Sequence, residues 1–151
     1  MGRRIIVLGI LLFAAPAWAS VGEDSTWKIT VTPDAQAKAQ GERPGKDTLI
    51  FRGDTFTSTG CVKYGFAPSS YSASGAPETW SWKADQNSIK QGTTQWKGTA
   101  KGDAIEGTMV WRHPDGKSLT YTFSGKRKAG WHLGWFNRGN RARAKQSTTQ
   151  R

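Results

Sequence analysis

Few residues in this chain could act as nucleophiles or metal ligands. The sequence contains a single cysteine, Cys61, and two histidines, His113 and His132. Cys61, His113 and Asp115 hold the groups of a thiol-based triad, but His113 and Asp115 flank a proline in a turn, where polar residues are expected in any case. The two histidines lie nineteen residues apart, which is not the spacing of a metal site. We therefore expect no catalytic residues, no metal and no cofactor.

An enzyme would also need several titratable groups that converge in one cleft. The carboxylates of the body, such as Asp85, Asp103 and Glu106, fall beside turns or on the polar faces of expected strands. Because these positions are typical of solvated side chains, we interpret the protein as a non-enzymatic one.

Aromatic residues are the second group that could bind something, since the chain has eight tryptophans in 151 residues. Six large aromatic side chains fall on the apolar parity of their expected strands: Trp27, Trp80, Trp82, Trp96, Trp111 and Tyr121. Each such ring can bury about 150–250 Å². Two interpretations stay open: the rings fill the interior of the domain, or they line a cavity for a small apolar or aromatic ligand.

The third candidate is a basic, aromatic tail over residues 126–151, which holds eight basic residues and no acidic one. Its candidate polyanion-binding residues are Lys126, Arg127, Lys128, Trp131, Trp135, Arg138, Arg141, Arg143 and Lys145. Aromatic and basic side chains together suit nucleic acid or an anionic membrane surface. Alternatively, residues 131–136 dock on the body as a last strand or plug. From about residue 137 the composition predicts disorder.

Residues 1–19 have the pattern of a cleavable signal peptide. Arg3 and Arg4 precede an apolar stretch of eleven residues, 5–15, which is too short to cross a bilayer as a helix. Ala17-Trp18-Ala19 is a small-x-small cleavage site. We expect cleavage after Ala19, a secreted or periplasmic location, and no transmembrane segment in the mature chain.

Residues 20–125 show the alternation of apolar and polar side chains that is typical of half-buried strands. The clearest runs are 27–32, 80–85, 96–101, 105–111 and 119–123; a short apolar run at 48–51 is followed by a turn into residues 55–59. Residues 62–71 are less regular, and residues 34–40 could make one or two helical turns. This pattern predicts an all-β domain of about seven or eight antiparallel strands.

Short turns join these runs, among them the hairpin signal Gly102-Asp103. Consecutive hairpins favour an up-and-down meander closed into a barrel, which leaves no exposed sheet edge; a β-sandwich is the alternative. Gly98 and Gly107 lie within strands, where a glycine marks a bend or makes room for a large side chain opposite.

Trp27 near the expected mature N-terminus, the run of hairpins, and Lys126-Arg127 after the last strand resemble the calycin barrels, lipocalin-like or avidin-like. The chain is also similar to small uncharacterised secreted bacterial proteins of that shape. The calycin resemblance implies that Trp27 closes one end of the barrel and that Lys126 or Arg127 packs on its ring as a cation–π contact.

Taken together, these patterns predict a signal peptide (1–19), a β-barrel domain (20–125) and a basic tail (126–151). The favoured hypothesis is a secreted or periplasmic binding protein whose tryptophan-lined interior accepts a small apolar or aromatic ligand. The alternative is a protein that binds a polyanion or the envelope surface through its tail.

Overall fold

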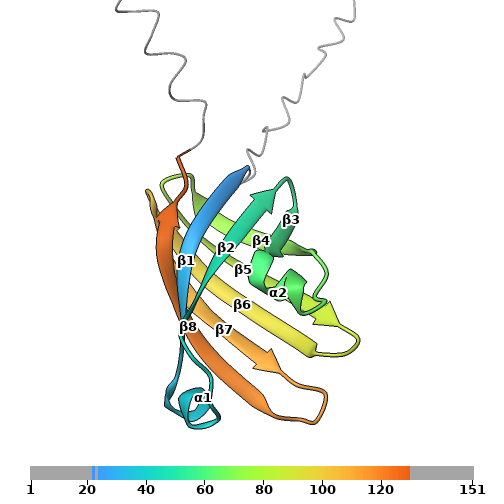
Figure 1. Ribbon diagram of the computed structural model, residues 1–151. Helices are drawn as coiled ribbons and strands as arrows, with labels where there is room; N and C mark the ends of the chain where they lie inside the picture. Colours follow the sequence, from blue (N-terminus) through green and yellow to red (C-terminus); the bar gives the residue numbers. More distant parts are fainter. Residues whose placement is uncertain (1–21, 23, 130–151) are drawn as a thin grey trace, which may run out of the picture.

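The protein is a closed eight-stranded antiparallel barrel in which each strand pairs with the next along the chain and the last returns to the first (Figure 1). The computed structural model describes residue 22 and residues 24–129. The strands are β1 (Ser25–Pro33), β2 (Gly45–Arg52), β3 (Thr55–Ser58), β4 (Ser69–Ala76), β5 (Thr79–Ser88), β6 (Gly92–Lys101), β7 (Ala104–Arg112) and β8 (Ser118–Arg127). The predicted up-and-down barrel is therefore confirmed, and the sandwich alternative is not what forms.

Two five-residue helices interrupt the meander. Helix α1 (Ala35–Ala39) lies between β1 and β2, where one or two helical turns were predicted, and the Asp34 carboxylate caps it by accepting a 2.8 Å hydrogen bond from the Ala37 amide. Helix α2 (Thr59–Lys63) lies between β3 and β4, in the region whose pattern was irregular. The carboxylate of Asp47 holds its first turn, because it accepts hydrogen bonds from Thr59 Oγ1 and from the Gly60 amide. Neither helix, nor any other in the described residues, is long and apolar enough to cross a membrane.

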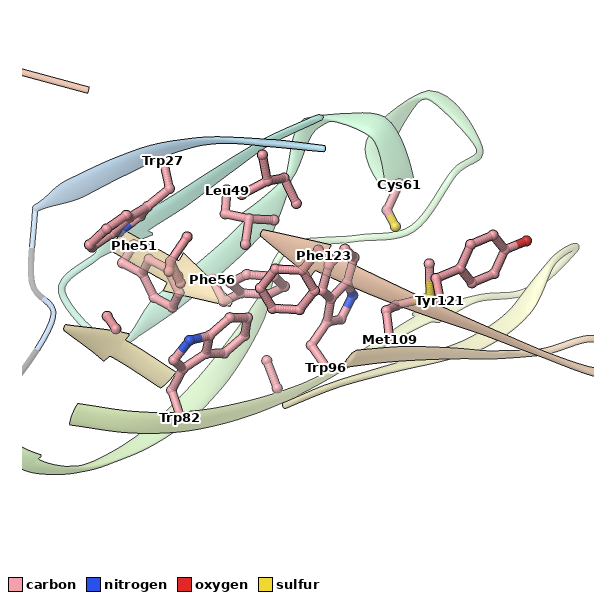
Figure 2. Close-up of a cluster of buried hydrophobic side chains, with 14 of the residues drawn as sticks. Trp27, Leu49, Phe51, Phe56, Cys61, Trp82, Trp96, Met109, Tyr121 and Phe123 are labelled. Atoms are coloured by element: carbon pink, nitrogen blue, oxygen red, sulfur yellow. The ribbon is translucent and has the colours of Figure 1, made fainter. Parts of the chain in front are cut away.

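The interior of the barrel is packed with aromatic and aliphatic side chains (Figure 2). The most deeply buried of them are Trp27, Leu49, Phe51, Phe56, Trp80, Trp96, Ala100 and Ile105. They come from six of the eight strands, and those on β1, β5, β6 and β7 have the parity that the alternation predicted. The core is thus built by the inward faces of the strands, and the opposite faces are polar.

Two facing glycines make room for two of the largest core rings. Gly98 on β6 and Gly107 on β7 are directly opposite each other in the ladder. A Cβ atom at Gly98 would lie 2.8 Å from Nε1 of Trp82, and one at Gly107 would lie 2.6 Å from Cζ of Phe123. The two rings therefore lie over backbone that carries no side chain, which is the second of the two roles that the sequence suggested for these glycines.

The start of β1 and the end of β8 lie side by side at one end of the barrel (Figure 1). The Trp27 indole donates a 2.9 Å hydrogen bond to Ser25 Oγ, which in turn donates one of 2.7 Å to the Gly22 carbonyl. The guanidinium carbon of Arg127 lies 4.7 Å from the centroid of the Trp27 ring. The cation–π contact expected between these positions is present, with Arg127 rather than Lys126 as the cation.

Candidate functional site

The six aromatic residues predicted to line a ligand cavity divide into two groups in the structure. Trp27, Trp80, Trp82 and Trp96 lie in the core, each no more than 3% exposed. Their rings contact other rings: Trp82 lies 5.0 Å from Phe56 and Trp80 lies 6.4 Å from Trp27, both measured between centroids. These are the separations of packed aromatic pairs. That the four bind a ligand stays a prediction, and their contacts are those of a filled core.

Trp111 and Tyr121 lie farther along the barrel, toward the end at which β7 turns into β8. The Trp111 indole donates a 2.7 Å hydrogen bond to the Gln91 carbonyl, and its ring stacks on His113 with centroids 4.0 Å apart. Tyr121 is almost fully buried, and this burial raises the pKa of its phenol well above the usual value. The neighbouring carboxylate of Glu42 raises this pKa further. Both side chains therefore belong to the packing of this end.

The candidate polyanion-binding residues fall mostly outside the described part of the chain. Trp131, Trp135, Arg138, Arg141, Arg143 and Lys145 all lie there, as does the predicted signal peptide. Lys126 and Arg127 end strand β8, and the Lys128 amide continues the ladder by donating to the Thr26 carbonyl over 2.7 Å. The first residues of the predicted tail are thus part of the barrel, two residues beyond the expected end of the domain.

The groups of a thiol triad have separate structural roles. Cys61 faces the core from α2, and burial raises the pKa of its thiol to about 11. At neutral pH it is therefore a protonated thiol and a weak nucleophile. His113 stacks on Trp111, and the Asp115 carboxylate accepts a 3.0 Å hydrogen bond from the Lys117 amide within the turn. The described residues contain no group of three or more acidic, histidine or cysteine side chains that could hold a metal.

A groove of about 870 Å³ lies on the outer face of the six strands β4, β5, β6, β7, β8 and β1. We call it the outer groove. Its floor is formed by residues of inward parity, including the glycine pair Gly98 and Gly107. Its side chains come from the polar parity of the strands. A barrel is narrowest at its waist, because twisted strands give it the shape of a hyperboloid, and its outer surface can be concave there.

The side chains of the outer groove form two rows that run across the strands. The lysine row, in ladder order, is Ser72, Lys83, Lys97, Thr108, Thr122 and Thr32. The glutamate row, two residues away along each strand, is Ser74, Ser81, Thr99, Glu106, Ser124 and Thr30. With strands about 4.8 Å apart, six of them span about 24 Å. The outer groove is therefore long and rich in hydroxyl groups.

The charges of the outer groove are not neutralised in pairs. Lys83 and Lys97 are directly opposite each other on β5 and β6, an arrangement of like charges that destabilises a sheet. Among the described residues, the ion pairs are Arg52 with Asp24 and Lys117 with Asp115, so neither lysine nor Glu106 takes part in one. Two ammonium groups and one carboxylate therefore stand free among the hydroxyls.

Sequence reasoning did not identify the outer groove. Its side chains occupy the polar positions of the strands, and such a pattern is also typical of ordinary solvated surface. In addition, which residue lies opposite each lysine depends on the register between strands. The one available signal is the abundance of Ser and Thr at these positions, for example Thr108 and Thr122.

Comparison of the chain with family models, curated proteins and solved structures gives no match. The resemblance to calycin barrels therefore stays a prediction that rests on the residues named above. A fold does not by itself imply an activity, so the functional role of the protein rests on the geometry of this barrel.

Proposed function

We propose that this protein is a non-enzymatic binding protein that holds a segment of polysaccharide in the outer groove. The observation that carries the proposal is the ladder register, which places Ser and Thr hydroxyls side by side in two rows across six strands. A hydroxyl group both donates and accepts hydrogen bonds. A surface of such groups is complementary to the hydroxyls of a sugar chain.

The shape of the outer groove favours a chain over a compact ligand. Sites for small molecules enclose most of the ligand surface. The outer groove is open and crosses six strands, so an extended polymer can lie along it while one side stays in solvent. The aromatic floor residues Trp82 and Phe123 are each 3% exposed and offer no ring face to the groove.

Because these rings are buried, the outer groove fits a polysaccharide better than it fits a nucleic acid or a membrane surface. Single-stranded nucleic acid is held by bases stacked on exposed aromatic rings. A membrane surface is bound by an apolar face that enters the lipid. The outer groove has neither feature, whereas hydroxyl groups line both of its rows.

A small apolar ligand in the barrel interior is the hypothesis that the tryptophan content first favoured. The ring contacts of Trp80 and Trp96, at 5.3 Å from Phe51 and 5.6 Å from Phe56, favour a core that is filled by its own side chains. We therefore place the binding site on the outer face. Export to the periplasm or the medium, expected from residues 1–19, is part of the proposal, because polysaccharides of the envelope are found there.

Affinity electrophoresis in gels that contain neutral and acidic polysaccharides tests the proposal. Thr108→Trp places a large side chain in the middle of the lysine row, and we expect it to weaken retention at least tenfold, which is about 1.4 kcal/mol. Thr57→Trp is the matched control, since Thr57 lies on β3 with outward parity and does not border the outer groove. Migration of the wild-type protein that no polysaccharide alters, or equal retention of both variants, would contradict the proposal.

A further inference from the structure

The lysine row places two positive charges side by side, and the hydroxyl groups of the row do not neutralise them. Lys83 and Lys97 face each other across β5 and β6 on the outer face. Lys97 in turn faces Thr108, and Lys83 faces Ser72. On both sides of the pair, the ladder neighbours are thus neutral hydroxyl residues. In the free protein the two ammonium groups repel each other, and an anion between them would remove that repulsion.

The acidic groups nearest in register do not supply this anion. Glu106 on β7 and Asp85 on β5 are diagonal neighbours of the pair, two residues away along their strands. Diagonal neighbours have Cα atoms about 7–8 Å apart. Neither carboxylate forms an ion pair among the described residues. Glu106 stands in the opposite row of the groove, where it repels an anion.

We infer that Lys83 and Lys97 bind an anionic group of the polysaccharide, a carboxylate or a sulfate ester, and so make the outer groove selective for acidic chains. This inference rests on the proposed function. The two ammonium groups donate to the oxygens of the anion, and the hydroxyls of the row donate to and accept from the adjacent sugar hydroxyls. Glu106 fixes which edge of the chain faces which row, because the anionic edge is repelled from the glutamate row.

The test measures binding of a polyuronate, of the same polymer with its carboxylates methyl-esterified, and of a sulfated dextran, each by isothermal titration calorimetry at low salt. The variant is Lys83→Gln/Lys97→Gln. The matched control is Lys63→Gln/Lys90→Gln, which removes the same charge from two exposed lysines outside the outer groove. Far-ultraviolet circular dichroism shows that each variant is folded.

We expect the Lys83→Gln/Lys97→Gln variant to lose at least tenfold in affinity for the acidic chain, while the control loses less than twofold. Glu106→Gln should raise that affinity. The effects should shrink in 1 M salt, where the screening length falls to about 3 Å. A larger loss on the polyuronate assigns the anion as a carboxylate, and a larger loss on the sulfated dextran assigns it as a sulfate ester.

Three results would overturn the inference. The first is equal wild-type affinity for the polyuronate, the sulfated dextran and the esterified polymer, which would leave a neutral polysaccharide site and the proposed function intact. The second is an equal loss in both double variants, which would indicate unspecific attraction by net charge. The third is the absence of binding to all three polymers and to a neutral glucan, in which case the proposed function fails together with the inference.

Discussion

Arg127 and Trp27 join the last strand of the barrel to the first, with the guanidinium carbon 4.7 Å from the ring centroid. Such a contact is worth about 0.5–1 kcal/mol when exposed and about 2 when desolvated. We expect Arg127→Ala to lower the free energy of unfolding by about 1 kcal/mol and Arg127→Lys to lower it by less. Urea denaturation followed by tryptophan fluorescence measures both. If Arg127→Ala leaves the free energy of unfolding unchanged, the contact does not help to hold β8 against β1.

The facing glycines of β6 and β7 should tolerate no side chain. A Cβ at Gly107 would clash with the Lys97 carbonyl oxygen, and one at Gly98 would clash with Trp82. Overpacking of this kind costs about 1–3 kcal/mol. We therefore expect Gly98→Ala and Gly107→Ala each to lower the melting temperature.

Gly45→Ala is the control for this pair, because a Cβ at Gly45 would have no heavy atom within 4 Å and its backbone is not left-handed. Its melting temperature should stay close to that of the wild type or rise slightly, since alanine restricts the unfolded chain more than glycine does. If all three variants have the same melting temperature, the packing of the Trp82 and Phe123 rings does not require glycine at positions 98 and 107.

Much of this architecture could be predicted from local patterns. The hairpin signal Gly102-Asp103 predicts the turn between β6 and β7, and a two-residue turn sets the register that brings Gly98 opposite Gly107. Strand β4 was not predicted, because its segment is rich in small polar residues and shows no apolar alternation. The short helix α2 is held by the side chain of Asp47, a distant residue, which local propensity does not reveal.

The outer groove is a harder case, because a concave outer face results from the closure and twist of the whole barrel. Lys83 and Lys97 lie fourteen residues apart in the chain, and only the register of β5 against β6 makes them opposite neighbours. The sequence likewise does not decide whether the tryptophans fill the interior or line a cavity. Their parity places each ring inside the barrel, but it does not show whether other rings fill the remaining space.

The two opposed lysines should make the free barrel less stable than it could be. Like charges directly opposite each other in a sheet are destabilising. We expect Lys83→Thr or Lys97→Thr to raise the free energy of unfolding by a few tenths of a kcal/mol at low salt, with the gain reduced at high salt. Lys90→Thr, in the turn between β5 and β6, serves as the control and should give no such gain. A loss of stability in either variant would indicate that the ammonium groups do not repel each other.

The buried thiol of Cys61 predicts a loss of stability at alkaline pH. Burial raises its pKa from 9.0 to about 11 in the folded protein, so the folded state keeps a proton that the unfolded state loses. Between pH 9 and 11 the unfolded state therefore binds fewer protons, and the free energy of unfolding falls by up to about 1.4 kcal/mol per pH unit. Below pH 9 this contribution is constant.

Cys61→Ala isolates this effect, because tyrosine and lysine titrations occur in both proteins. The difference in the free energy of unfolding between wild type and variant should be flat below pH 9 and should then shift against the wild type. Loss of the sulfur atom adds a constant to this difference in free energy at every pH. The test is therefore the slope of the difference against pH, and not its size. Parallel curves up to pH 11 would show that the thiol ionises as readily in the folded protein as in the unfolded chain.

The central claim is that the ligand lies on the outer face of the barrel and not among the tryptophans. Titration of a ¹⁵N-labelled sample with an acidic oligosaccharide, followed by heteronuclear NMR, tests it most directly. We predict that the backbone amide signals of Thr99, Thr108 and Thr122 shift with a common saturation curve, while the indole N–H signals of Trp27 and Trp96 stay in place. Shifts confined to those indole signals, with the amides of the outer groove unmoved, would contradict the account.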